Sequence, residues 1–173
     1  GFRGDTQYNM RYKYRGNFSF RVENLINEAR GLPEYSKSNV FNVRWSHSKD
    51  PKSSPNSTFS ASVNFGSSDY YRQSVNQLNS PNFLNNNLSS SISYSKSFPE
   101  YPRVNISLTT AMSQNSQSKS VNLTLPTFQA SMERIYPFAP KVGAKQGFFQ
   151  NINFQYTSRA ENRIITTEEA LFG

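Results

Sequence analysis

The feature that most constrains this chain is an alternation of apolar and polar residues with a period of two, which recurs along most of its length. Residues 88–98, for example, read LSSSISYSKSF, with Leu88, Ile92 and Tyr94 separated by serines. Successive side chains of an extended strand point to opposite faces of a sheet. The pattern therefore predicts an all-β protein whose strands each carry one apolar face.

The same alternation predicts about eight antiparallel strands of roughly 6 to 12 residues each. Gly16 and Asn17 offer a tight turn after the first strand. The pattern breaks over residues 23–38, around Gly31 and Pro33, which predicts a loop. Pro126 is expected to interrupt the seventh strand. The predicted strands cover residues 7–15, 18–22, 41–45, 59–65, 88–98, 104–112, 121–132 and 152–156.

Domain organisation follows from where the alternation ends. We expect residues 1–160 to form one antiparallel β-barrel segment and residues 161–173 to form a loop or frayed terminal extension. Within that extension, residues 166–172 are expected to form a short helical turn or to fray, with Thr167 as a candidate cap before two glutamates.

Composition supports a β protein and argues against several function classes. Only 35% of the 173 residues are apolar, yet 14% are aromatic, a balance typical of strands rather than helices. No apolar run approaches the roughly 20 residues of a membrane helix. The net charge of +8 suits an anionic partner, but no nucleic-acid-binding motif accompanies it. With no cysteine, a disulfide framework is excluded.

Two architectures bury one face of each strand: a soluble β-sandwich and a transmembrane β-barrel. Several predicted strands approach the 9–11 residues that cross a bilayer at a tilt. Their apolar faces carry aromatic residues near the strand ends, and their polar faces mix small uncharged residues with arginine and lysine. These features favour the outer-membrane barrel. A secreted carbohydrate-binding sandwich stays open as an alternative.

Two sets of residues are candidates for function in such a barrel. Basic side chains on the polar faces are expected to line the lumen, where they solvate it or contact anionic groups. Amphipathic aromatic rings are expected to form an interfacial belt. The basic set is Arg11, Lys13, Arg15, Arg21 and Arg44, and the aromatic set is Tyr8, Tyr12, Tyr14, Trp45, Tyr94 and Tyr156.

Catalysis is not expected. His47 is the only histidine, and no cysteine or carboxylate pair stands at ligand spacing, so neither a zinc site nor a catalytic triad is predicted. We interpret His47 as a strand-end residue near Asp50. No metal, cofactor or catalytic residue is predicted.

Several stretches, in order, resemble the LptD (OstA) family of lipopolysaccharide-assembly barrels, in the form found in Bacteroidetes. The stretches are GLPEYS at 31–36, RWSH at 44–47 with Asp50 and PNS at 55–57, FSASVN at 59–64, LSSSISYSKSF at 88–98, LTLP at 123–126 and RIYPF at 134–138. The resemblance covers residues 30–160 and is built partly from low-complexity pieces.

The resemblance implies a non-enzymatic translocon in the bacterial outer membrane. Such a barrel delivers lipopolysaccharide to the outer leaflet, with an LptE-like lipoprotein plugging its lumen, and needs no cofactor or nucleic acid. The family's barrel is longer than this chain, so we expect a fragment from its centre. A small self-contained eight-stranded barrel, acting as an adhesin or structural anchor, is the structural alternative.

Overall fold

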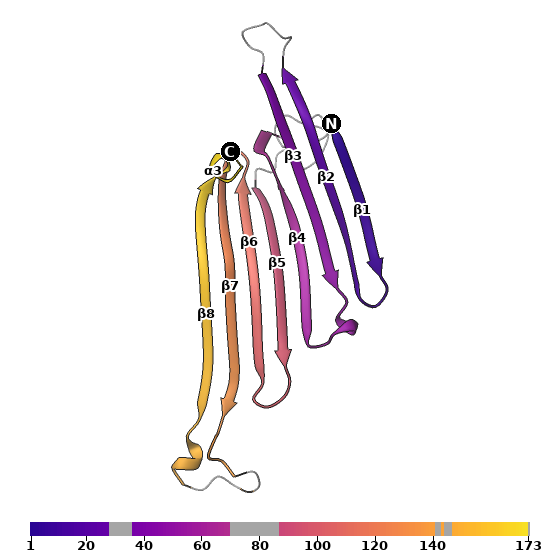
Figure 1. Cartoon of the computed structure of the whole chain (residues 1–173). Helices are drawn as coiled ribbons and strands as arrows, with labels where there is room; N and C mark the ends of the chain where they lie inside the picture. The colour runs from indigo at the N-terminus through magenta and orange to yellow at the C-terminus, as the bar shows by residue number, and fades with distance from the viewer. Residues whose placement is uncertain (28–35, 70–86, 141–142, 144–146, 173) are drawn as a thin grey trace.

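A single antiparallel sheet contains most of the residues that the structure describes (Figure 1). The computed structural model describes residues 1–27, 36–69, 87–140, 143 and 147–172. Eight strands follow one another in the order β1 to β8, each paired with its neighbours in sequence. The strands are β1 (Phe2–Met10), β2 (Tyr14–Asn27), β3 (Ser36–Lys49), β4 (Ser57–Gly66), β5 (Asn87–Phe98), β6 (Val104–Asn115), β7 (Ser120–Ile135) and β8 (Phe154–Thr167).

The sheet is open, with β1 and β8 at its opposite edges (Figure 1). Its strands are 9 to 16 residues long, which meets the length needed to cross a bilayer at a tilt. The prediction of about eight antiparallel all-β strands is confirmed, and the open edges fit a part of a larger barrel.

Helical structure is confined to short pieces in the described residues. Two 3₁₀ turns, η1 (Pro51–Ser53) and η3 (Phe149–Asn151), precede β4 and β8, and a five-residue helix, α3 (Glu168–Phe172), follows β8. The expected helical turn near the C-terminus is thus present. In the described part of the chain, no helix combines the length and apolar character needed to span a membrane.

The register keeps the alternation of neighbouring strands in phase, so the sheet has an apolar face and a polar face. Residues directly opposite each other on paired strands project from the same face. Phe18 of β2 lies opposite Trp45 of β3, which lies opposite Val63 of β4. Farther along, Leu108 lies opposite Phe128. One continuous apolar face therefore runs across all eight strands.

Most of this apolar face is uncovered. Leu108 in the middle of β6 is 39% exposed, and Tyr156 on the edge strand β8 is 58% exposed. Among the described residues, the buried apolar side chains are Val40, Ala61, Leu88, Val121 and Leu123. A soluble sandwich would bury such a face against a second sheet, and the described residues form only one sheet.

The first hairpin corrects a sequence prediction. The chain turns at residues 11–13, where Tyr12 has a left-handed φ of 61° and the Lys13 amide donates to the Met10 carbonyl at 3.0 Å. One strand over residues 7–15 with a turn at Gly16 and Asn17 was wrong. Because Met10 and Tyr14 are register partners four residues apart, the alternation keeps its phase through the turn and does not reveal it.

Three other boundaries differ from the prediction because strands run farther than their clear alternation. β2 continues to Asn27 and β3 begins at Ser36, so strand replaces much of the expected loop at 23–38; residues 28–35 lie outside the described part. β8 extends through Thr167, so residues 161–167 form strand instead of loop. On β8 the apolar Ile165 lies on the same polar face as Arg163, so the apolar–polar alternation is unclear there. The division into units 1–160 and 161–173 stays a prediction.

β7 runs unbroken through Pro126, where the predicted interruption takes the form of a bulge. The β7–β8 register shifts between Thr124 and Thr127, and the β6–β7 register shifts opposite the same residues, between Thr109 and Ala111. Proline has no amide hydrogen to give to a ladder, so within sheets it is found at edges or bulges. The bulge lets the chain keep both faces of β7 in phase on either side of the proline.

Candidate functional site

The polar face carries a cluster of charged side chains over β1, β2 and β3. Arg3 lies directly opposite Arg21, and two residues farther along Asp5 lies opposite Ser19, which lies opposite Arg44. These four charged residues, Arg3, Asp5, Arg21 and Arg44, are called the arginine cluster. Together with Ser19, Phe20 and Asn42 they line a small cavity of about 100 Å³.

Two members of the arginine cluster are paired with each other, because the Asp5 carboxylate forms an ion pair with the Arg3 Nε. The Nε of Arg44 is buried without a hydrogen-bond partner. A buried donor left without a partner is costly, so this arrangement favours an anionic oxygen close to Arg44.

A larger hollow of about 790 Å³ lies at the turn end of the same strands. Its lining mixes the amides and hydroxyls of the polar face with Arg15 and a few residues of the apolar face. The lining residues are Gln7, Tyr8, Asn9, Arg15, Gly16, Asn17, Ser46, His47, Ser48 and Ala61. Most of the residues that line the two hollows lie on the polar faces of β1 to β3, which fits a surface that encloses a watery lumen.

In the middle of the sheet the polar face is uncharged. Over β4, β5 and β6 its positions are small and uncharged, and several hydroxyls pair across strands, as between Thr58 and Ser95 at 2.7 Å and between Ser60 and Ser93 at 2.8 Å. Charge returns on β8, where Glu161 accepts from Arg159 and Arg163, each at 2.7 Å. The arginine cluster is therefore separated from the charges of β8 by the uncharged polar-face positions of β4, β5 and β6.

On the apolar face, aromatic side chains gather around His47 near the turn end of β1 to β4. The ring centroid of His47 lies 5.6 Å from Tyr14, 5.7 Å from Tyr8, 6.1 Å from Trp45 and 5.3 Å from Phe59. We call these five residues the aromatic cluster. It has the amphipathic rings that an interfacial belt requires.

A short chain of hydrogen bonds links the polar atoms of the aromatic cluster. The Trp45 indole Nε1–H donates to the Tyr8 hydroxyl at 2.8 Å, and that hydroxyl pairs with the His47 Nδ1 at 2.9 Å. Tyr8 lies across Gly16, where a Cβ would collide with its hydroxyl and with the Ser46 carbonyl oxygen. A glycine opposite Tyr8 is therefore a condition for the cluster to form.

We expect Tyr8→Phe to destabilise the folded protein by about 1–2 kcal/mol, because it removes the shared partner of Trp45 and His47. Tyr14→Phe is the control, since its ring stacks on His47 while the hydrogen-bond chain stays intact. Urea titration of the full-length protein in lipid vesicles measures both. Equal shifts in the two variants would contradict a stabilising role for the Tyr8 hydroxyl.

The structure places the predicted basic residues in two different settings. Arg15, Arg21 and Arg44 lie on the polar face, and the last two belong to the arginine cluster. Arg11 and Lys13 instead lie in the β1–β2 turn, and the Arg11 guanidinium covers the Tyr12 ring at 4.7 Å. Placing those two on a strand face was wrong, because the alternation keeps its phase through the turn and so does not reveal it. A role of the remaining three in lining a lumen stays a prediction.

The aromatic cluster includes three of the predicted aromatic residues, Tyr8, Tyr14 and Trp45. A fourth, Tyr94, lies opposite Phe59 of that cluster. Tyr156 projects from the same face but far away, on β8, while Tyr12 is in the turn. The belt itself stays a prediction.

Sequence reasoning missed Arg3, Asp5 and Phe59 as site residues, because only the register shows their neighbours. His47 does stand near the end of β3, but it contacts Tyr8, while Asp50 accepts from the Lys52 amide at 2.9 Å. No group of histidine, cysteine, aspartate and glutamate suited to a metal occurs among the described residues.

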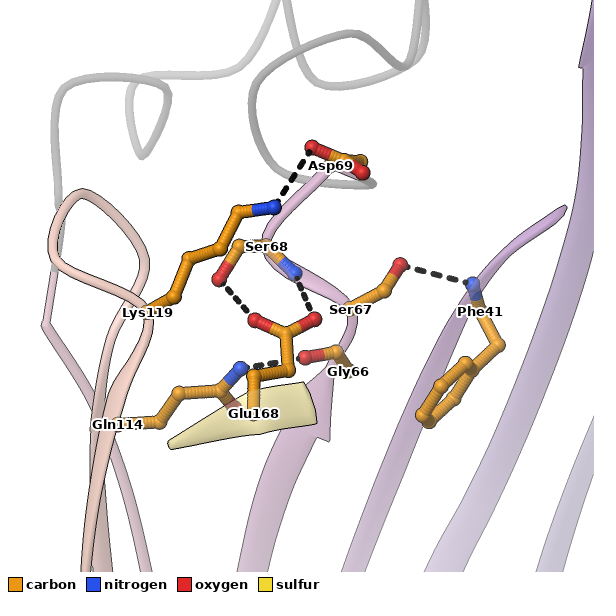
Figure 2. Close-up of polar contacts among 8 residues, drawn as sticks. All are labelled: Phe41, Gly66, Ser67, Ser68, Asp69, Gln114, Lys119 and Glu168. Carbon is orange, nitrogen blue, oxygen red and sulfur yellow. Dashed lines mark hydrogen bonds and ion pairs between the residues drawn. The ribbon is translucent and has the colours of Figure 1, made fainter. Parts of the chain in front are cut away.

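At the other end of the sheet, a polar network joins the segment after β4 to the segment after β8 (Figure 2). The Glu168 carboxylate accepts from the Ser68 amide at 2.8 Å and from the Ser68 hydroxyl, although the two residues are 100 positions apart. The Gln114 side chain donates to the Gly66 carbonyl at 2.6 Å, and Lys119 lies 4.0 Å from Asp69. We call these contacts the latch.

The latch lies where the apolar face is covered. Gln114 is the register partner of Leu88 and Val121, and all three are buried. The backbone of Glu168 is also hydrogen-bonded, because its amide donates to the Lys119 carbonyl at 2.9 Å. The latch therefore joins the end of β4 to β6, to the β6–β7 turn and to α3. It contains no residue of the arginine cluster or of the aromatic cluster.

Comparison with known proteins identifies a family. A family model described as "LptD protein" matches residues 1–172, which is nearly the whole chain. No curated protein and no solved structure matches the chain.

Proposed function

The chain belongs to the LptD protein family, and from this premise we propose that it forms part of the wall of an outer-membrane β-barrel that carries lipopolysaccharide to the outer leaflet. The family is one of lipopolysaccharide transport and assembly, not of enzymes. In this proposal the strands guide the passage of a glycolipid and perform no covalent chemistry. An LptE-like lipoprotein plugs the lumen.

The observation that carries the proposal is the separation of the two faces over eight consecutive strands. An uncovered apolar face with exposed aromatic rings is stable against hydrocarbon, while large exposed apolar patches in water lead to association. The opposite face offers hydroxyls, amides and a few charges, which suits a hydrated lumen. Strands of 9 to 16 residues supply the length that crossing a bilayer requires.

The two alternatives receive less support. A self-contained eight-stranded barrel needs β1 to pair with β8, and these strands lie at opposite edges of the sheet. A soluble sandwich needs a cover for the apolar face, on which Leu108 is 39% exposed. Open edges on both sides instead favour continuation into further strands of a longer chain.

The test is the mass and composition of the native protein, extracted from membranes gently enough to keep its partners attached. We expect a protein several times heavier than this chain, found in the outer-membrane fraction together with lipopolysaccharide and a lipoprotein. A native protein near the 19.7 kDa of this sequence would rule out the assembly barrel. It would leave the small barrel or the soluble sandwich.

A further inference from the structure

We propose that Lys49 and Lys96 bind the headgroup phosphate of an anionic phospholipid, at the border of the apolar face. These two residues are called the lysine pair. The inference rests on the proposed function only for the assignment of the apolar face to lipid. It adds a lipid-binding site on the outside of the barrel wall, separate from the lumen.

The lysine pair lies on the apolar face, close to the turn end. Lys49 is the register partner of Tyr14 and Lys96 is the register partner of Ile106, so both project from the apolar side of the sheet. Lys49 is the last residue of β3, and Lys96 stands two residues before the end of β5. At a membrane boundary, a lysine keeps its stem against apolar surface and its ammonium group among the headgroups.

Ser57, the first residue of β4, lies between the two lysines. The Lys49 Nζ donates to the Ser57 hydroxyl at 2.6 Å, and Lys96 is directly opposite Ser57 in the β4–β5 ladder. The Lys96 Nζ lies 4.8 Å from the centre of the Phe98 ring. The lysine pair therefore flanks one hydroxyl group from the strands on either side of β4. Ammonium groups beside a hydroxyl suit the oxygens of a phosphate, which are strong acceptors.

No carboxylate neutralises the lysine pair. Within the described part of the chain, neither lysine forms an ion pair. The β3–β4 and β5–β6 connections, each taken with three strand residues on either side, contain four basic residues against two acidic ones, Asp50 and Glu100. Asp50 accepts from the Lys52 amide at 2.9 Å. An anion from outside the chain would supply the missing negative charge.

The same excess of positive charge marks the whole turn end. The turn end, with three strand residues on either side of each connection, covers residues 8–16, 47–59, 96–106 and 133–156. The opposite end, counted in the same way, covers residues 1–4, 25–38, 64–89, 113–122 and 165–173. The sequence has ten basic and three acidic residues at the turn end, against five of each at the opposite end. The turn end therefore holds most of the net charge of +8, and basic residues next to a membrane are attracted to anionic lipid.

The lengths of the connections favour phospholipid as the source of the phosphate. Three of the four connections at the turn end have 3, 7 and 5 residues, while the β4–β5 connection at the opposite end has 20. The β7–β8 connection, with 18 residues, is the exception. In outer-membrane barrels the short turns face the periplasm. On that side the barrel meets the phospholipid leaflet, whereas lipopolysaccharide is delivered to the outer one.

The experiment uses the full-length protein in nanodiscs of phosphatidylcholine with a minority of phosphatidylglycerol. Native mass spectrometry measures how strongly the released protein retains phosphatidylglycerol over phosphatidylcholine. We expect Lys49→Gln with Lys96→Gln to lower this preference at least about fivefold, because each lysine near an anionic surface contributes about that factor. The control, Lys13→Gln with Lys52→Gln, removes the same charge from turns at the same end and is expected to keep more than about half of the preference.

Equal losses in the two double variants, or no loss in either, would overturn the lysine pair as a site. In a second arm lipopolysaccharide replaces phosphatidylglycerol, and a preference for it alone, lost in the lysine-pair variant, would overturn phospholipid as the ligand. If that double variant fails to fold, Lys96→Gln alone keeps the hydrogen bond of Lys49 to Ser57 and is expected to lower the preference at least about twofold. Failure of the proposed function is seen separately, as native protein that carries no lipopolysaccharide yet retains phosphatidylglycerol through the lysine pair.

Discussion

Leu108→Arg is expected to destabilise the membrane-embedded protein by about 2–4 kcal/mol, the cost of an arginine on the lipid face of a barrel near the bilayer midplane. Leu108 lies near the middle of β6, on the apolar face between Tyr94 and Phe128, and is 39% exposed. The guanidinium would then sit in hydrocarbon with no charged partner. Urea titration of the full-length protein in lipid vesicles measures the loss.

The neighbouring residue supplies the matched control. Ser107 is on the same strand but on the polar face, opposite Ser95 and Gln129. In a hydrated lumen, Ser107→Arg is expected to change the free energy of unfolding by less than about 1 kcal/mol. Equal costs for the two arginines, or a larger cost at Ser107, would contradict the assignment of the two faces and with it the barrel.

Gly16→Val is expected to be the most damaging small substitution in the first hairpin, with a loss of at least about 3 kcal/mol. A Cβ at Gly16 would collide with the Tyr8 hydroxyl and with the backbone oxygen of Ser46. The ring of Tyr8 would have to leave, which also breaks its hydrogen bonds to Trp45 and His47. The measurement is the fraction of full-length protein that migrates as a folded barrel in an unheated gel.

Gly4 is the control for this substitution, because it lies on the same face of the same hairpin. A Cβ at Gly4 meets no atom within 4 Å, so Gly4→Val is expected to fold like the wild type, helped by the preference of valine for strands. If Gly4→Val and Gly16→Val lose folded protein to the same degree, the cost belongs to glycine replacement in general and not to contact with Tyr8.

The all-β fold and its antiparallel strands were predictable because a two-residue period is a local signal. Residues 88–98 show it most clearly, and β5 has nearly the bounds expected there. The signal failed where local information is ambiguous. At residues 11–13 the alternation keeps its phase through the turn, and in β8 Ile165 lies on the polar face beside Arg163, so the strand looks like a loop.

The candidate site was predictable only in part. Arg15, Arg21 and Arg44 could be placed on the polar face because each lies within a strand with clear alternation. Arg11 and Lys13 could not, because their placement depended on the position of the turn. The pairing of Tyr8 with His47, 39 residues apart, has no local signal at all.

The sequence by itself determined that this chain forms amphipathic strands without helices long enough to span a membrane, because side-chain alternation depends only on neighbouring residues. The tertiary structure alone decided which residues meet. Register brings Arg3 opposite Arg21, and long-range folding brings Ser68 to Glu168. The physical reason is that strand pairing joins residues far apart in the chain, so contacts across strands follow from the whole sheet and not from any one segment.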